Sequence, residues 1–206
     1  MGGQYGDDLL IARARQGDVA AFNGLVERYQ GLAYSVAYRT LGDAEAAADA
    51  TQDAFLAAFN AIRGFRGGEP FRARQAFTAW LLRIVTNACF DIARRAQRRP
   101  STSLDRMLEE RGEAATDRIV DPDPPPEGEA LRAELIEQIQ EALLQLPFDQ
   151  RTAVVLSDLH GLSYDEVAET TSTSLGTVKS RIARGRAKLR DLLGARPELS
   201  PGSVRP

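Results

Sequence analysis

Six basic side chains and no acidic one lie between Ser174 and Arg190, a density of positive charge that suits binding to nucleic-acid phosphates. If this stretch is a helix, one face of it can reach base edges in the major groove, and the amides at its start can bind phosphate. The residues of that face are Lys179, Ser180, Ala183 and Arg184, and those at the start are Ser174, Gly176 and Thr177. A basic helix surface without a ligand is the alternative.

A second candidate site combines an aromatic ring, Trp80, with cations. Polar side chains recur at helical spacing after this ring, opposite an apolar stripe, and end in a cluster of arginines. The polar residues are Arg83, Asn87, Asp91, Arg94, Arg95, Arg98 and Arg99, and the apolar ones are Phe77, Leu81, Ile84, Ala88 and Ile92. Aromatic rings beside cations suit unpaired bases and phosphates, so this stripe is a candidate for binding a single strand. Two alternatives stay open: a solvated surface for the stripe, and a core position for Trp80.

The sequence offers little for catalysis or metal binding. His160 is the single histidine and Cys89 the single cysteine, so they can assemble neither a zinc site nor an internal disulfide. Nine acids against three arginines lie between Ser101 and Glu129, in a stretch that has the composition of a linker. We therefore expect no enzymatic activity, no metal and no cofactor, and a nucleic-acid-processing enzyme is the least favoured interpretation.

Helices must position these side chains, and the sequence predicts an all-α chain of two small domains. Apolar residues recur at spacings of three and four, and no convincing run of alternating β-branched residues is present. In a first domain, residues 7–99, we expect helices over 18–41, 44–63 and 76–98. In a second domain, residues 131–195, we expect helices over 131–146, 149–159, 163–170 and 174–193.

Local signals support these helix boundaries. Asp43 is a candidate N-cap, and Gly161 suits a left-handed C-terminal cap. Ser163 and Glu166 have the spacing of a capping box, in which each side chain binds the backbone amide of the other residue. The last two helices, joined by a tight turn, form the pattern of a helix-turn-helix.

A Pro-rich segment separates the two domains. Residues 121–128 contain four prolines, which remove amide donors and disfavour helix, so residues 100–130 are predicted to be a flexible acidic linker. Residues 196–206 are predicted to be a disordered tail. The sequence leaves open whether the two domains pack on each other.

The overall composition is that of an ordinary soluble protein, with 43% apolar and 27% charged residues. No uninterrupted apolar run approaches the roughly 18 residues of a membrane helix, and residues 1–8 lack the basic start of a signal peptide. We expect a cytoplasmic protein without membrane insertion.

Three stretches together resemble a known family. They are "FNGLVERYQGLAYSVAYRTLGDAEAAADATQDAFLAAF", "FTAWLLRIVTNACFDIARRAQRR" and "LQLPFDQRTAVVLSDLHGLSYDEVAETTSTSLGTVKSRIARGRAKLR". In order and spacing they are similar to the extracytoplasmic-function (ECF) sigma factors, which direct RNA polymerase to promoters. The resemblance runs from about Asp7 to Leu193, the linker excepted.

This resemblance implies a role for each candidate residue. Asp49, Gln52, Asp53 and Phe55 match the segment that docks on the β′ clamp helices of core RNA polymerase. Arg66, Trp80, Arg83, Asn87, Asp91, Arg94 and Arg95 match the part that opens and reads the minus-10 element. Ser174, Gly176, Thr177, Lys179, Ser180, Ala183, Arg184 and Arg186 match the part that binds the minus-35 element. The resemblance also implies the β flap, promoter DNA and an anti-sigma factor as partners.

Departures from the family pattern also lead to expectations. Ser172 stands in the turn where glycine is usual, so the turn either avoids a left-handed residue or is strained. The loop "RGGEPFRARQ" is longer than usual, which bears on the minus-10 preference. Ala50 replaces a larger apolar residue of the docking helix, which is expected to weaken one contact with the polymerase. The competing interpretation is a stand-alone helix-turn-helix regulator that binds an operator as a dimer, which would leave the first domain without a function.

Overall fold

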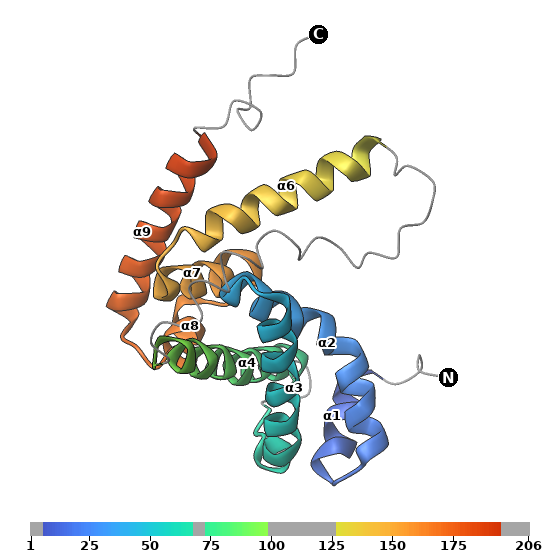
Figure 1. Cartoon of the computed structure of the whole chain (residues 1–206). Helices are drawn as coiled ribbons and strands as arrows, with labels where there is room; N and C mark the ends of the chain where they lie inside the picture. Colours follow the sequence, from blue (N-terminus) through green and yellow to red (C-terminus); the bar gives the residue numbers. More distant parts are fainter. Residues whose placement is uncertain (1–5, 68–72, 99–126, 195–206) are drawn as a thin grey trace.

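The computed structural model describes residues 6–67, 73–98 and 127–194, and every regular element within these ranges is helical (Figure 1). The first domain consists of α1 (Asp7–Arg15), α2 (Val19–Leu41), α3 (Ala44–Ala61), the short 3-10 helix η1 (Ile62–Gly64) and α4 (Ala73–Arg98). The all-helical prediction is confirmed. Helix α1 was not predicted. Residues 100–126 of the predicted linker (100–130) and the predicted tail (196–206) lie outside the described residues.

Side-chain caps and one glycine fix the helices of the first domain. The Asp18 carboxylate accepts a hydrogen bond from the Ala21 amide at 3.0 Å, and the predicted N-cap Asp43 accepts one from Ala46 at 2.7 Å. Gly42 ends α2 in the left-handed conformation, with φ of +81°. The turn between α2 and α3 is therefore tight, and it brings the two helices side by side.

Helices α2, α3 and α4 bury one common core. Leu25, Val36 and Leu81 are fully buried there, and Phe77 is 1% exposed. The buried face of α4 is displaced from the predicted stripe, because Ile84, Ala88 and Ile92 are only half-buried. The residues that complete its buried face are Leu82, Val85 and Cys89.

The segment Gln75–Gln97 of α4 is long and apolar enough to cross a membrane by length and composition alone, with a mean hydropathy of 1.2. A helix that contributes one face to a soluble core passes the same test. The burial of Phe77 and Leu81 in the core of the first domain identifies α4 as such a helix.

The second domain contains α6 (Glu127–Leu144), α7 (Phe148–Val154), the π-helical turn η4 (Val155–Leu159), α8 (Tyr164–Thr170) and α9 (Leu175–Gly194). Helix α6 begins inside the predicted linker, and the predicted 149–159 helix is α7 continued as η4. The capping box of Ser163 and Glu166 is confirmed, as is the left-handed Gly161. Val167, Val178 and Ile182 form the core between α8 and α9, whereas Leu175 is 37% exposed.

The two domains pack against each other, which the sequence left open. The C-terminal end of α2 contacts α6, α7 and η4, and α4 lies beside α8 (Figure 1). Because of this packing, the polar side of α4 lies beside the helix-turn-helix.

Candidate DNA and polymerase interfaces

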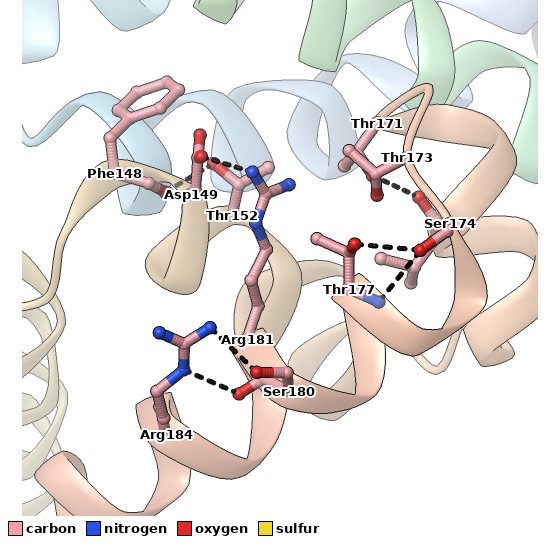
Figure 2. A network of polar contacts seen from close by, with 11 residues as sticks. Phe148, Asp149, Thr152, Thr171, Thr173, Ser174, Thr177, Ser180, Arg181 and Arg184 are labelled. Carbon is pink, nitrogen blue, oxygen red and sulfur yellow. Dashed lines mark hydrogen bonds and ion pairs between the residues drawn. The ribbon is translucent and has the colours of Figure 1, made fainter.

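Helices α8 and α9 and the turn between them form the predicted helix-turn-helix. Ser174 caps α9, since its Oγ accepts the Thr177 amide at 3.1 Å and lies 2.8 Å from Thr177 Oγ1 (Figure 2). In the same turn, Thr171 Oγ1 and Thr173 Oγ1 lie 3.0 Å apart. Ser172 has φ of +51°, so of the two expectations for this position the strained turn is the one observed.

The outer face of α9 is open. Lys179, Ser180, Ala183 and Arg184 are all exposed, as are Ser174 and Gly176 at the start of the helix. The Arg184 guanidinium lies back along the helix, where it donates to Ser180 Oγ at 2.8 Å and to the Ser180 carbonyl at 3.3 Å (Figure 2). These two bonds use only two of the five N–H donors of the guanidinium and leave it at the surface, from which rotation about the side chain can direct it outward.

Two other cations of α9 are paired with acids of the same domain. Arg181 pairs with Asp149 of α7 (Figure 2), and Arg186 binds Asp158 of η4 through Nε at 2.8 Å and Nη2 at 2.7 Å. The hydrogen bond from Arg186, followed by that from Ser157, lowers the pKa of the Asp158 carboxyl against the opposing effect of burial. The expectation that Arg186 belongs to the DNA-reading face stays a prediction, and in this structure its guanidinium binds the Asp158 carboxylate with two hydrogen bonds.

The polar face of α4 carries the predicted minus-10 residues. Arg83, Asn87, Asp91, Arg94 and Arg95 are exposed along it. Asp91 accepts from Arg94 at 3.2 Å, and the Arg94 guanidinium carbon lies 5.9 Å from the centre of the Phe90 ring. Both contacts involve neighbours on the same helix, so Arg94 keeps its charge at the surface, whereas Arg83 pairs with Glu169 of α8 at 3.6 Å.

Trp80 lies at the edge of the core of the first domain. It is half-buried, with its ring centroid 5.0 Å from that of Phe65 and 5.6 Å from that of Phe77. Of the two open alternatives, the structure favours a core role for most of the ring. Arg66 is exposed just before residues 68–72, which lie outside the described residues, as does most of the long loop.

The predicted docking residues divide between surface and core. Asp49, Gln52 and Asp53 are exposed on α3, whereas Phe55 is only 9% exposed and Ala50 is fully buried. Ala50 therefore has no surface from which to contact a partner, contrary to the expectation for that position.

Beside these residues, α2 and α3 enclose an apolar groove of about 830 Å³ that the sequence analysis did not identify. Leu56 and Phe59 are 58% and 40% exposed along it, and Gln52 and Phe55 also line it. The signal in the sequence is that α3 has alanines at helical spacing, Ala47, Ala50, Ala54 and Ala58, which form its buried stripe, and carries its large apolar residues Leu56 and Phe59 outside that stripe. No group of three metal-binding side chains lies among the described residues.

The comparisons with known proteins agree with these two domains. Residues 25–99 match the family described as sigma-70 region 2, and residues 136–189 match sigma-70, region 4. The ECF RNA polymerase sigma factor SigE of Mycolicibacterium smegmatis is 36% identical over 91% of this chain and 67% of its own length. The ECF RNA polymerase sigma-E factor of Escherichia coli is 35% identical over 90% of this chain and 93% of its own length.

Solved structures give the same result. CnrH, solved in complex with the cytosolic domain of CnrY, is 32% identical and superposes with a TM-score of 0.59, covering 92% of this chain and 97% of that one. The sigma factor RpoE of Bartonella quintana, solved with the anti-sigma factor NepR, has the same fold, with a TM-score of 0.59, 23% identity and coverage of 85% and 98%. The matched regions span both domains, so a stand-alone helix-turn-helix regulator is not supported, and this chain belongs to the ECF sigma factors of RNA polymerase.

Proposed function

We propose that promoter recognition by this sigma factor is divided among three surfaces: the outer face of α9 for the minus-35 element, the polar face of α4 for the minus-10 element, and the α2–α3 groove with its acidic margin for core polymerase. The observation that carries this proposal is the sorting of cations on α9. Arg181 and Arg186 are paired with carboxylates of the same domain, whereas Lys179 and Arg184 are exposed and the hydrogen bonds of Arg184 go to Ser180 of its own helix.

For the minus-35 element, α9 has the shape and charge to enter a major groove. Its exposed face begins at the N-terminal end, where amides can bind phosphate, and continues through Lys179 to Arg184. Arg184 has to exchange its two bonds to Ser180 for bonds to a base, which favours a partner that offers two acceptors, as guanine does.

The test compares Arg184→Ala with Arg190→Ala, a matched change on an exposed cation farther along α9. Full-length variants with core polymerase would be assayed for binding to a promoter library at several salt concentrations. We expect Arg184→Ala to lose about 1–3 kcal/mol of discrimination at one or two base pairs. Arg190→Ala should weaken all sequences alike and reduce the salt slope by about one unit at most. A uniform loss with Arg184→Ala would assign that side chain to phosphate instead.

For the minus-10 element, α4 offers an amide and several cations on a face that is not part of the core. Asn87 can bind the edge of an unpaired base, and Arg83 and Arg95 can bind backbone phosphates. We expect Asn87→Ala to impair promoter melting, seen by permanganate footprinting, while binding of the closed complex stays near normal. Gln97→Ala, which removes an exposed amide near the end of the same helix, is the control. Normal melting by a folded Asn87→Ala protein would refute the assignment.

For core polymerase, the α2–α3 groove offers apolar area, and Asp49 and Asp53 place negative charge beside it. Exposed Leu56 and Phe59 indicate a surface that gains free energy when a partner helix covers it. Acids at the margin suit a basic partner and speed association.

The double variant Asp49→Lys/Asp53→Lys should therefore lower co-purification with core enzyme. Asp8→Lys/Asp191→Lys, the same charge change at exposed positions on α1 and α9, should leave it unchanged. Equal yields from both pairs would exclude the acidic margin from docking.

We further infer that this protein acts in the cytoplasm, performs no catalysis of its own and is restrained by an anti-sigma factor. The support for restraint by an anti-sigma factor is that RpoE, a sigma factor with the same fold, was solved in complex with the anti-sigma factor NepR. Competition between a candidate anti-sigma protein and core polymerase for the full chain would test it, and simultaneous binding of both would count against restraint at the polymerase-binding surface.

A further inference from the structure

Lysine is rare in this chain and occurs on one helix only. Of the 26 lysines and arginines, two are lysines, Lys179 and Lys188, and both lie on α9. The two kinds of cation differ chemically, because a lysine amine can lose its proton and react at nitrogen, whereas a guanidinium stays protonated. The helix proposed for the minus-35 element therefore carries all the side-chain amines of this sequence.

The cations of α9 differ in what holds them. Arg181 and Arg186 are paired with acids of the same domain, and Arg184 donates to Ser180 of its own helix (Figure 2). Lys179 is exposed and forms no salt bridge with another of the described residues. On the proposed reading face, Lys179 therefore carries the charge that a reaction at nitrogen can remove.

The helical neighbours of Lys179 leave its amine accessible to a reagent. Residues three before and four after it lie on its side of the helix, and these are Gly176 and Ala183, both exposed. Neither has a side chain that can cover Nζ or pair with it. Lys188 differs, because Asp191 follows it by three residues and places a carboxylate on its side of the helix. That carboxylate repels an anionic reagent, so Lys179 is the more accessible amine.

An acyl phosphate is the class of reagent that suits this position. It is small and anionic, and the basic surface of α9 raises the local concentration of anions. The unprotonated Nζ attacks the carbonyl carbon of the reagent, so that the N–C bond forms as the C–O bond to phosphate breaks. Phosphate leaves with the electron pair of that bond, and the proton of the amine passes to water. The product is an uncharged amide, and nothing is oxidised or reduced.

We propose that Lys179 is an acylation site through which the promoter affinity of this sigma factor is regulated. Acylation removes a cation from the face that enters the major groove. Loss of one phosphate contact reduces the salt slope by about one unit, which corresponds to about a fivefold loss of affinity at about 0.15 M salt. The docking residues lie on α3, so assembly with core polymerase should not change. This inference rests on the proposed function of α9.

The test treats the full chain with acetyl phosphate, removes the reagent and then adds untreated core polymerase. Peptide mass spectrometry locates the acetyl groups, for which Lys188 and the amino terminus are the alternative positions. Affinity for the tightest-binding duplex of a promoter library is measured for the wild type, Lys179→Arg and Lys188→Arg, each against its own untreated sample. Both substitutions keep the positive charge and remove one amine. A chain synthesised with acetyllysine at position 179 gives full occupancy of the site.

We expect acetyl groups on Lys179, and about a fivefold loss of promoter affinity on treatment of the wild type and Lys188→Arg. Lys179→Arg should keep most of its own untreated affinity, and the chain with acetyllysine at position 179 should show the full loss without treatment. Absence of acetyl groups from Lys179 would overturn the site. Equal losses in the two arginine variants, or a fall in co-purification with core enzyme that accounts for the loss, would overturn it as well.

Unchanged affinity of the chain with acetyllysine at position 179 would overturn regulation, and Arg184→Ala then separates two cases. If Arg184→Ala still relaxes discrimination at one or two base pairs, the proposed function of α9 stands and only the inference about Lys179 fails. If Arg184→Ala has no effect on binding, both fail.

Discussion

The close packing of α9 on α7 leads to a prediction at Gly185, a buried glycine in the middle of the basic helix. A Cβ at this position would lie 2.7 Å from Val154 Cγ2 and 3.5 Å from the carbonyl of Gln150. Val154 is 2% exposed and packed on all sides, so it cannot turn away freely. The change Gly185→Ala should therefore push α9 away from α7, although alanine is the better helix former.

Two opposing effects set the change in the free energy of unfolding that Gly185→Ala causes. Replacing an interior helical glycine by alanine gains about 1 kcal/mol of helix propensity. Overpacking a closed interior costs about 1–3 kcal/mol. Because the added Cβ would lie well inside the normal separation from Val154 Cγ2, we expect the cost of overpacking to exceed the gain in helix propensity. Gly185→Ala should therefore lower the free energy of unfolding by about 1 kcal/mol. Gly176→Ala in the same helix meets only Ser174 Oγ at 3.9 Å, so it should gain stability.

Urea denaturation of the full chain, followed by circular dichroism, measures both changes. The double variant Gly185→Ala/Val154→Ala removes the colliding methyl groups, so its loss should be smaller than the sum of the two single losses. If Gly185→Ala stabilises the chain as much as Gly176→Ala does, α7 and α9 can move apart at little cost. That result would refute the reasoning from close packing. Because α7 holds α9 at this contact, Gly185→Ala should also weaken minus-35 binding without changing its sequence preference.

Three further predictions concern the second domain. Ser172→Gly should stabilise the chain by about 0.5–1 kcal/mol in thermal melts, because relief of a left-handed serine outweighs the added freedom of the unfolded chain; a loss of stability would mean that the turn is unstrained. Burial, and then the charge of Arg39, lower the pKa of His160 from 6.5, so its neutral form stabilises the fold above pH 6.5 and this contribution is lost as the pH falls below that value. Urea midpoints of His160→Gln should accordingly vary less between about pH 7.5 and about pH 5 than those of the wild type. Arg186→Ala and Asp158→Ala should lower stability by similar amounts, below about 1 kcal/mol, with promoter preference unchanged; a shift in preference with Arg186→Ala alone would restore it to the reading face.

Local signals in the sequence were sufficient for most of the fold. The N-cap at Asp43, the capping box at Ser163 and the left-handed Gly161 each depend on residues within one turn, and all three are present. Helix α1 was missed because its short apolar set, Leu10, Ile11 and Ala14, is too brief to define a period. The π-helical turn η4 could not be predicted, because it does not change the spacing of apolar residues in a way that the sequence shows.

The sequence predicted those features of the candidate site that depend on a single helix. It could not predict the contacts that its side chains make with a second helix. Charge counting located the basic helix, but it could not show that Arg181 and Arg186 are bound by acids 32 and 28 residues away. The same limit applies to Phe55 and Ala50, which share α3 with the exposed residues proposed for docking but are themselves buried. Contacts between distant segments decide which members of a charged or apolar set remain available to a partner.

The hydrogen bonds between the end of α2 and the second domain have a consequence for how this protein can change over generations. Gln140 Nε2 and Arg151 Nη1 donate to the carbonyls of Tyr38 and Thr40, which are main-chain oxygens and identical in every amino acid. Substitution at positions 38 and 40 therefore leaves these acceptors chemically in place. Heritable change in these two hydrogen bonds must arise mainly at Gln140 and Arg151, whose side chains supply the donors.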